Sequence, residues 1–430
     1  MKITFLLGSG ISIPANLPGV EKLTNAVLAG EDLIVEKNGK LDRISSHARS
    51  LDDEQEGREK LRRILIFLDW LKAQAACRYV ENRERSVTYE DLAYLAGQIH
   101  DDLADEYENP ALQPFVRNVV IDLGGLFGDT APSAARNELR ELACSTVGYI
   151  RSAVGLLLKT PHADSSYLQI FADACRDESV TEKNLFTLNH DILLEEFLKE
   201  SGLRFVDGLR EACNGDGSRR WDPSVFDDVD SQQSVKVFKL HGSVDWFRWE
   251  LKTGGSQTKI LVDNADRNGR FIGTYNKTGT ELYERILQNE GPQLLVGTFN
   301  KILGYNSEMF LELHYRFHRA LQDCKTLVIC GYGFGDKGVN TRIAEWRHHS
   351  SEHKLLIIDP SEPSKIVQKA RGAIRREIAA IDAKSAIDIP PGPVEHWPNG
   401  LAECLESTGD RVVTWERLRA TLRCNCDPSR

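Results

Sequence analysis

The sequence lacks any apolar run long enough to cross a bilayer. Charged residues interrupt every longer apolar stretch well before the roughly 18 residues that a transmembrane helix needs. The apolar run at residues 3–7 is too short for the core of a signal peptide, and glycines follow it at once. We therefore expect a protein without a membrane segment or a targeting sequence.

The nine cysteines form no Cys-x-x-Cys pair, so the spacing that is usual for a four-thiolate zinc site is missing. They are scattered and odd in number. The nearest two, Cys424 and Cys426, lie at the end of the chain, where a frayed tail is the simpler interpretation. We expect reduced thiols, a cytoplasmic location and no bound metal.

Positive charge is in deficit, with 54 Lys and Arg against 64 Asp and Glu and a net charge of −10. A protein that binds nucleic acid over its whole surface has the opposite balance, so the net charge excludes a basic field over the whole protein and leaves a local basic patch open. No direct nucleic-acid-binding module is evident in the sequence. With 41% hydrophobic and 27% charged residues, the composition excludes wholesale disorder and a coiled-coil rod. The 430 residues suffice for two or three domains, or for one large α/β body with insertions.

Short apolar segments recur along the chain, and each of them ends in a glycine-rich or polar turn. Continuous apolar strands of this kind are typical of a parallel sheet that is covered on both faces. Strand, polar turn and helix in succession predict an α/β fold with a Rossmann-like, doubly wound parallel sheet. The predicted strands are residues 3–7, 184–188, 235–240, 326–330 and 354–358.

A long segment of different character separates the first two of these strands. It is rich in Leu, Ala, Glu and Arg and has helical spacing, as in Leu61, Ile64 and Leu68. We interpret it as a large helical insertion packed on the sheet. The expected organisation is a domain over 1–360, with a Rossmann-like core at 1–44 and 181–360 and the insertion at about 45–180, followed by a C-terminal extension over 361–430.

The turn after the first strand contains Gly8, Ser9, Gly10 and Ser12. Its two glycines allow a close approach of the backbone, and amides at the start of a following helix can cradle a pyrophosphate. Ile13 stands where the Gly-x-Gly-x-x-Gly fingerprint has its third glycine, and no Gly-Lys-Ser/Thr follows, which excludes a P-loop here. A purely structural turn explains this segment alone equally well.

Polar residues follow the strands at 184–188 and 235–240. Thr187 and Asn189 lie where a doubly wound sheet binds its ligand, and an asparagine can hold ribose hydroxyls or an attacking water. Asp191 can cap the next helix, serve the site, or do both. His241 is a candidate general base, although on this motif alone a structural histidine bonded to backbone is the more common explanation.

Three alternating glycines follow the strand at 326–330. Gly331 and Gly333 suggest a backbone that is pressed against a ligand, with Phe334 between the glycines and Asp336 capping the next helix. Asp359, after the last predicted strand, can hold a ribose or simply end the strand. Together the turns lie at strand carboxyl ends, where one bound dinucleotide can contact them all.

In its order of motifs, the chain resembles the sirtuin NAD-binding fold. The motifs are Gly-Ser-Gly-Ile-Ser at 8–12, Thr-Leu-Asn-His-Asp at 187–191, His-Gly-Ser at 241–243 and Gly-Tyr-Gly-Phe-Gly-Asp at 331–336. The chain is more similar to the bacterial sirtuin-like branch that consumes NAD during antiphage defence. The likeness covers residues 1–30 and about 180–360, and the Tyr-Glu-Asp-Leu segment at 89–92 is similar to one in the helical insert of that branch.

The chain departs from the protein-deacylating sirtuins, which carry a four-cysteine zinc ribbon beyond the catalytic histidine. That ribbon helps to form the cleft for an acyl-lysine peptide, so its absence argues against a deacylase. Ser9 also replaces the usual alanine of the first motif, and His190 replaces an apolar residue. These two departures put the detailed ribose and nicotinamide geometry in doubt, and not the binding of NAD.

The resemblance implies that the chain is an NAD+ glycohydrolase that cleaves NAD+, its substrate, to nicotinamide and ADP-ribose, as the NAD-depleting effector of an abortive-infection system. Cleavage of the nicotinamide–ribose bond develops positive charge on the ribose. Asn189 would orient the ribose hydroxyls or the water, His241 would accept a proton, and Asp191 would steady that end of the site. The resemblance implies that Gly8, Ser9, Gly10 and Ser12 hold the phosphates of NAD+, and that Gly331, Gly333, Phe334 and Asp336 pack on the adenosine side. Thr187 and Asp359 are also expected among the residues that bind NAD+.

Two other functions stay open at this stage, an NAD-dependent protein deacylase and a non-catalytic module that senses NAD or ADP-ribose. The resemblance further implies a homo-oligomer and a separately encoded partner, such as a HerA-type ATPase or a short Argonaute. The sequence does not choose between these partners.

Overall fold

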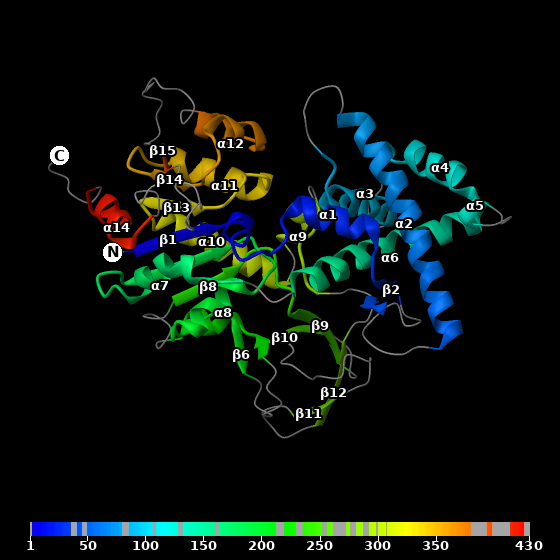
Figure 1. Ribbon diagram of the computed structural model, residues 1–430, viewed down its shortest axis with the longest axis horizontal. Coiled ribbons are helices and arrows are strands. Elements are labelled where there is room, and N and C mark those ends of the chain that lie inside the picture. The colour runs from blue at the N-terminus through cyan, green and yellow to red at the C-terminus, as the bar shows by residue number, and fades with distance from the viewer. Residues whose placement is uncertain are drawn as a thin grey trace.

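The predicted apolar segments all form strands of one parallel sheet, in a computed structural model of the chain (Figure 1). Two further strands join them, giving seven in the order β15-β14-β13-β1-β4-β8-β5. The prediction of an α/β, Rossmann-like fold is confirmed. The strands are β1 (Lys2–Leu7), β4 (Glu182–Thr187), β5 (Phe205–Val206), β8 (Val235–Lys239), β13 (Thr326–Cys330), β14 (Lys354–Ile358) and β15 (Val394–Trp397).

The structure describes most of the chain, and the statements below concern these residues only. They are residues 2–35, 41–44, 50–79, 86–105, 109–127, 132–159, 163–211, 219–228, 235–251, 256–260, 272–275, 281–286, 292–297, 300–306, 308–379, 394–397 and 413–424.

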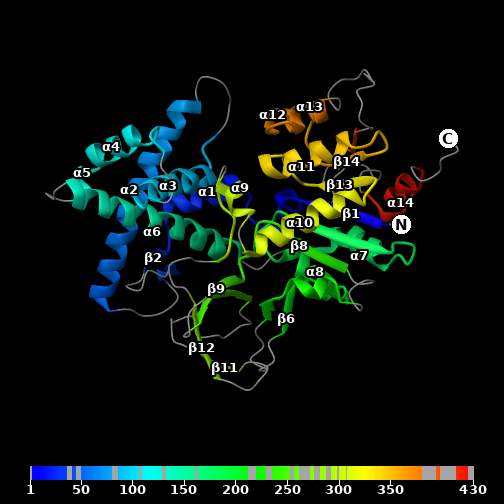
Figure 2. The same ribbon diagram turned by 180° about the vertical axis from the view of Figure 1, so that it is seen from behind.

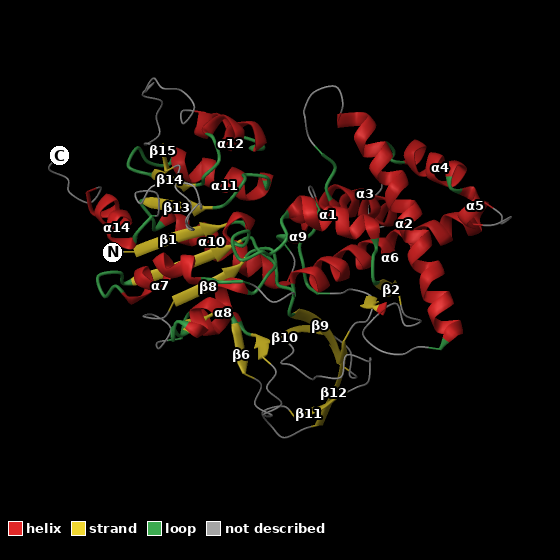
Figure 3. Cartoon of the chain, viewed as in Figure 1, coloured by secondary structure: helices red, strands yellow, loops and turns green. Residues whose placement is uncertain are grey.

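Helices cover both faces of the parallel sheet, which explains why its strands are apolar without alternation (Figure 3). Leu6 of β1 points into one core cluster, and Phe5 of the same strand points into the other. The first cluster is covered by α10 (Glu308–Gln322), α11 (Lys337–His348), α12 (Pro363–Lys369) and α13 (Ile374–Ile378). The second is covered by η3 (Ser166–Leu168), α7 (Gln169–Arg176), α8 (Leu193–Glu200) and α14 (Trp415–Cys424).

The strand order reverses beside β1, and this reversal creates the crevice in which such sheets bind ligands. From β1 the sheet continues through β4 to β8 on one side, and through β13 to β14 on the other. All of these pairings are parallel, so the carboxyl ends of β1, β4, β8 and β13 lie along one edge. The turns that follow these four strands carry most of the predicted site residues.

A helical lobe lies beside the sheet (Figures 1 and 2). Its helices bury their own apolar cluster, in which Phe67, Leu92 and Ile150 are fully or almost fully buried. A short antiparallel pair, β2 (Leu33–Val35) with β3 (Leu41–Arg43), completes it. The helices are α1 (Val20–Ala29), α2 (Leu51–Tyr79), α3 (Tyr89–Leu103), α4 (Gln113–Asp122), α5 (Gly124–Phe127) and α6 (Pro132–Leu158).

Packing does not follow the predicted domain boundaries residue by residue, and those boundaries stay predictions. Leu23 and Leu33, which precede residue 45, pack in the helical lobe. Phe171, which precedes residue 181, packs edge-on against Phe5 of β1 at 5.2 Å between ring centroids. Trp415, in the predicted C-terminal extension, is buried in the same cluster as Phe5.

A second, antiparallel sheet emerges below the parallel one in the view of Figure 1, and the sequence analysis did not predict it. Its strand order is β11-β12-β9-β10-β7-β6. The strands are β6 (Leu209–Glu211), β7 (Arg219–Trp221), β9 (Trp246–Leu251), β10 (Ser256–Ile260), β11 (Ile272–Tyr275) and β12 (Glu281–Ile286), and the 3-10 helix η4 (Pro223–Phe226) follows β7.

One helical stretch in the described residues, Ser133–Leu158 of α6, is long and apolar enough by composition to span a membrane. Half of its most apolar window is buried inside the protein. Leu139 and Ile150 of this helix are fully buried in the core of the helical lobe. Burial of this kind is typical of a helix in the core of a globular protein.

Candidate active site

A pocket of about 260 Å³ lies where the carboxyl edge of the parallel sheet meets helices α1 and α3. The short 3-10 helix η1 (Ser9–Ile11), which follows β1, and the loop after β13 form part of its wall. Most of the predicted site residues come together here from separate parts of the chain. Those that line the pocket are Gly8, Ser9, Ser12, Asn189, Asp191, His241, Gly333 and Asp336.

Two of the predicted glycines serve a contact between loops and do not line the pocket. The amide of Gly10 donates to the carbonyl oxygen of Gly331 at 2.9 Å. A Cβ atom on Gly10 would lie 2.7 Å from the Cα atom of Gly331, whose own φ is +61°. Close packing of the turns after β1 and β13 therefore accounts for both glycines.

Three other predicted residues also lie away from the pocket lining. Thr187 accepts the amide hydrogen of Asn189 at its Oγ1 atom, at 3.1 Å. Phe334 is fully buried in the sheet core with a φ of +53°. Asp359 accepts the amide hydrogen of Ser361 at 2.8 Å in the turn after β14. Their predicted roles in binding NAD+ stay predictions.

Asn189 and Asp191 are joined through the hydroxyl of Ser12. The Asn189 amide donates to Ser12 Oγ at 2.9 Å, and Ser12 Oγ donates to Asp191 Oδ2 at 2.9 Å. Asp191 also accepts the amide hydrogen of Leu193 at the start of α8. These hydrogen bonds fix the orientation of Asn189, whose Oδ1 atom is buried and has no hydrogen-bond partner among the residues that the structure describes. That oxygen is an acceptor available to a ligand in the pocket.

His241 follows β8 in a turn that requires glycine at the next position. Gly242 has a φ of +81°, and a Cβ atom there would lie 1.9 Å from the carbonyl oxygen of Gln293. The backbone of His241 is also held, because its carbonyl oxygen accepts the amide hydrogen of Leu295 at 2.9 Å. The imidazole is thus placed in the pocket wall by a rigid backbone.

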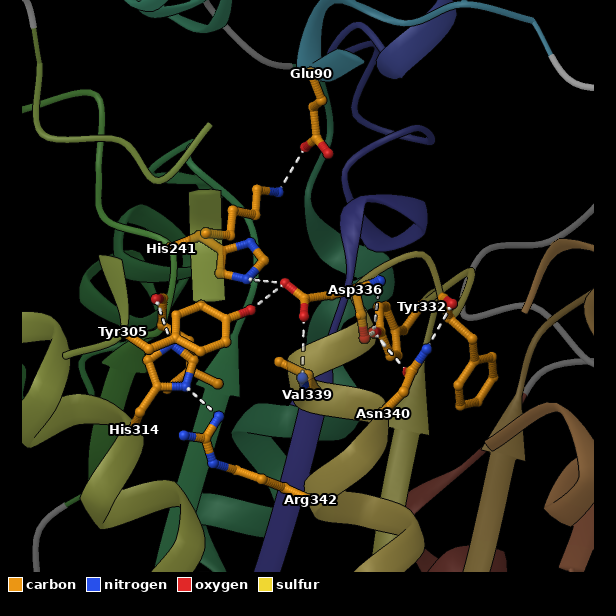
Figure 4. Close-up of polar contacts among 12 residues, drawn as sticks. Glu90, His241, Tyr305, His314, Tyr332, Asp336, Val339, Asn340 and Arg342 are labelled. Atoms are coloured by element: carbon orange, nitrogen blue, oxygen red, sulfur yellow. Dashed lines mark hydrogen bonds and ion pairs between the residues drawn. The ribbon is translucent and has the colours of Figure 1, made fainter. Parts of the chain in front are cut away.

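The His241 ring lies against the carboxylate of Asp336 (Figure 4). The Nε2 atom is 2.9 Å from Oδ2, and both side chains are almost fully buried. The ring N–H does not point straight at the oxygen, so this is a short polar contact and not a linear hydrogen bond, and it becomes an ion pair only when the ring is protonated. Asp336 was predicted to cap a helix and to pack on the adenosine side, and its contact with His241 was not predicted.

Burial lowers the pKa of His241, the positive charge of Lys301 lowers it further, and Asp336 opposes both effects. The net direction is downward, which keeps the imidazole neutral and able to accept a proton near neutral pH. Asp336 has a pKa well below its usual range, because the contacts with His241 and Lys301 outweigh the effect of its own burial. A neutral histidine beside an ionised carboxylate is a suitable general base.

Asp336 is fixed on three sides. Its Oδ1 atom accepts the amide hydrogen of Val339 at 3.0 Å and so caps α11, as the sequence predicts. The hydroxyl of Tyr305 donates to Oδ2 at 2.5 Å, and the Asp336 amide donates to the hydroxyl of Tyr332 at 3.2 Å. The carboxylate consequently has little freedom to move away from His241.

Three charged residues that line the pocket, Glu90, Lys301 and Arg371, were not predicted from the sequence as site residues. Glu90, at the start of α3, and Lys301, in the short helix α9 (Asn300–Gly304), both line the pocket and form an ion pair of 2.7 Å. The Tyr-Glu-Asp-Leu segment at 89–92, noted for its resemblance alone, was the one signal that pointed to Glu90. No motif pointed to Lys301.

Within the described residues, no group of three or more His, Cys, Asp or Glu side chains is arranged to hold a metal ion. The predicted absence of zinc stays a prediction. The pocket does offer polar groups for an organic ligand, namely the free Asn189 oxygen, the His241 imidazole and the Lys301 ammonium.

A doubly wound parallel sheet with a polar pocket at its carboxyl edge defines a Rossmann-like protein whose ligand binds at the strand reversal. Residues 183–382 match the family model of the SIR2-like domain. These residues are similar to the SIR2-like domain, and the prediction of a sirtuin-like superfamily is confirmed at that level.

A solved structure of a Sir2 homolog–NAD complex is similar to this chain at 12% identity and a TM-score of 0.31. The match covers 89% of this chain and 91% of that one. No functionally curated protein matches the sequence.

Proposed function

We propose that the protein is an NAD+ glycohydrolase that releases nicotinamide and ADP-ribose. The observation that carries the proposal is the meeting of Asn189, with a free amide oxygen, and His241, beside a carboxylate, in one pocket at the strand reversal. The SIR2-like match over residues 183–382 supports NAD+ as the ligand, and the ordered motifs of the sequence support the NAD-consuming branch.

In the proposed reaction the bond between the ribose C1′ atom and the nicotinamide nitrogen breaks, and its electron pair leaves with nicotinamide. Positive charge develops on the ribose in the transition state. The Asn189 Oδ1 atom accepts a hydrogen bond from a ribose hydroxyl or from the attacking water. His241 removes a proton from the water as the water oxygen bonds to C1′, which gives ADP-ribose.

The first prediction concerns this catalytic pair. Purified protein in its active state should release nicotinamide from NAD+ without any added peptide, and His241→Ala should lower kcat by about 100-fold or more because the general base is lost. Asn189→Ala should be similarly impaired because the ribose or water loses its acceptor. Chromatography of nicotinamide and ADP-ribose measures both effects.

His348→Ala is the matched control for this test. His348 is exposed, contacts Glu377 and does not line the pocket, so the same change of residue type leaves NAD+ cleavage intact. A His241→Ala variant as active as the wild type would overturn the proposed base. Nicotinamide release that requires a stoichiometric acyl-lysine peptide would support a deacylase instead, and binding without turnover would support a sensing module.

We further propose that the protein is a cytoplasmic antiphage effector that stays silent until it is triggered, because constant NAD+ depletion would kill the host. The support is the resemblance of the motif order to the antiphage branch. A homo-oligomer and a separately encoded partner, such as a HerA-type ATPase or a short Argonaute, belong to the same proposal. Mass measurement of the protein alone and with the product of the neighbouring gene tests it, together with NAD+ levels in infected cells.

A further inference from the structure

We propose that Asp336 is a positioning residue for His241, which holds the imidazole with its hydrogen on Nε2 and leaves Nδ1 as the proton acceptor. The inference rests on the proposed function only for the identity of the reaction. The placement of the two side chains is independent of the substrate.

The contact geometry selects one ring nitrogen. Nε2 of His241 lies 2.9 Å from the ionised carboxylate of Asp336, and a hydrogen on that nitrogen is favoured there because a lone pair would face negative charge. The other ring nitrogen points toward the side of the pocket where Glu90 lies (Figure 4). Because a neutral imidazole carries one hydrogen, Nδ1 is left as the acceptor.

Further hydrogen bonds fix the residues that contact Asp336. Tyr332 Oη donates to Asn340 Oδ1 at 2.8 Å, and the Asn340 amide donates to the carbonyl oxygens of Phe334 and Arg371, each at 2.8 Å. Asn340 is fully buried. These bonds fix the loop after β13 in the conformation that presents Asp336 to the pocket. A site carboxylate held this firmly is suited to orienting a base.

Several other titratable groups face His241, and they determine how its protonation responds to a change at Asp336. Lys301 opposes a positive charge on the ring, whereas Glu90 and Asp336 favour it. The His190 ring lies with its centroid 6.2 Å away, and the Tyr305 ring at 6.5 Å. His314 of α10 stacks on Tyr305 at 3.7 Å, and burial keeps the pKa of both neighbouring histidines well below the usual value.

The second prediction concerns Asp336→Asn. Asparagine caps a helix as well as aspartate does, so the fold and the cap of α11 should survive while the negative charge disappears. We expect kcat to fall by about 10- to 100-fold with little change in KM, because the base loses its orientation and not its substrate. The acid limb of the kcat/KM profile should move to lower pH, because the charge that favours protonated His241 is gone.

Two variants accompany this test. Asp222→Asn makes the same change at the cap of η4, outside the pocket, and should leave the pH profile unchanged. Tyr305→Phe removes one bond to the Asp336 carboxylate and keeps its charge, so kcat should fall less than in Asp336→Asn. A folded Asp336→Asn protein with a raised KM and an unmoved acid limb would overturn the inference and make Asp336 a substrate contact.

A measurement without substrate separates this inference from the proposed function. NMR titration of histidine-labelled protein, with His241 assigned through His241→Gln, reports its pKa and its tautomer directly. We expect the hydrogen on Nε2 in the wild type, and a lower pKa of His241 in Asp336→Asn. An Nδ1 hydrogen in the wild type, or an identical pKa in both proteins, contradicts the inference even if NAD+ is cleaved. If the wild type cleaves no NAD+, the proposed function fails and the titration still decides the role of Asp336.

Discussion

Gly10 and Gly333 lie in two neighbouring turns, but only one of the two positions requires a glycine for packing. At Gly10 a Cβ atom would lie 2.7 Å from the Gly331 backbone, whereas at Gly333 it would have no atom of the described residues within 4 Å. Only the first position is needed for packing between the turns, even though Gly333 lies closer to the pocket. The identity of a residue in a Gly-x-Gly pattern thus does not reveal whether it faces a ligand or another loop.

The third prediction follows from this contrast. Gly10→Ala should lower the free energy of unfolding by about 1–3 kcal/mol, because the added methyl group pushes the turns after β1 and β13 apart. Gly333→Ala is the matched control and should change stability by less than about 0.5 kcal/mol. Urea unfolding of the two variants measures the difference. Equal stability of both would contradict the loop contact.

Single site residues could be predicted from the sequence more readily than the residues that they contact. Asn189 and His241 stand out because each follows a predicted strand and carries a chemically useful side chain. Their contacts with Ser12 and Asp336 are made by residues far away in the chain, and no local pattern encodes a distance of that kind. Lys301 carries no motif at all, so its place in the pocket emerges only from the fold.

At the level of elements, the ion pair between Glu90 and Lys301 connects α3 of the helical lobe with α9. The Lys301 side chain is only 7% exposed and Glu90 is 24% exposed. Removing the anion therefore leaves a nearly buried ammonium group without its counter-ion, whereas removing the cation leaves a carboxylate that water can still reach. The two halves of the pair are not equivalent.

The fourth prediction uses this asymmetry. Glu90→Gln should lower the free energy of unfolding by about 1–3 kcal/mol, and Lys301→Met should cost less. Glu56→Gln breaks a surface ion pair with Lys60 of similar length, 2.8 Å, and should cost less than about 0.5 kcal/mol. The denaturant midpoints of the three variants measure these losses of stability. A larger loss in Lys301→Met than in Glu90→Gln would contradict the argument from burial.

The elements that could be predicted are those whose local pattern is unambiguous. β13 and β14 are uninterrupted runs of apolar residues, because both faces of the sheet are covered. Two strands of the antiparallel sheet, β6 and β7, escaped prediction because they are three residues each and carry arginine at the central position. So short a segment contains too few residues to show a period of two.

At the level of the whole molecule, three buried histidines make stability depend on pH. The pKa values of His190, His241 and His314 are lowered in the folded state, chiefly by burial. Unfolding restores an ordinary pKa of about 6.5, so each histidine takes up a proton on unfolding once the pH falls below that value. The stabilising effect of the neutral rings is present above about pH 6.5 and is lost on acidification.

The fifth prediction is a fall in the free energy of unfolding between pH 7.5 and pH 5.5, approaching about 1.4 kcal/mol per pH unit for each histidine. His314→Gln should make the slope shallower, because one proton-uptake site is removed without changing a pocket residue. Urea unfolding at several pH values measures it. Glu195 works in the opposite direction at the acidic end, because burial raises its pKa. A stability that rises on acidification would contradict the prediction.

The assignment of helices to the helical lobe or to the sheet was the hardest feature to predict from the sequence. Residues around Leu61 predicted a helical segment correctly in kind. The predicted boundaries stay predictions, but α1 packs in the helical lobe and α7 packs against the sheet, because packing partners are set by the fold and not by position in the sequence. Leucine-rich helical spacing shows that a face is buried and does not show which neighbour buries it.

The position of β1 at the centre of the sheet has a consequence for synthesis on the ribosome. β1 is made first, yet one of its two neighbours, β13, and the loop that carries Asp336 are made only after most of the chain. A nascent chain can hold Asn189 and His241 while the pocket still lacks the wall that orients the histidine. Under the proposed function, this order of synthesis delays NAD+ cleavage until the loop that carries Asp336 has been made.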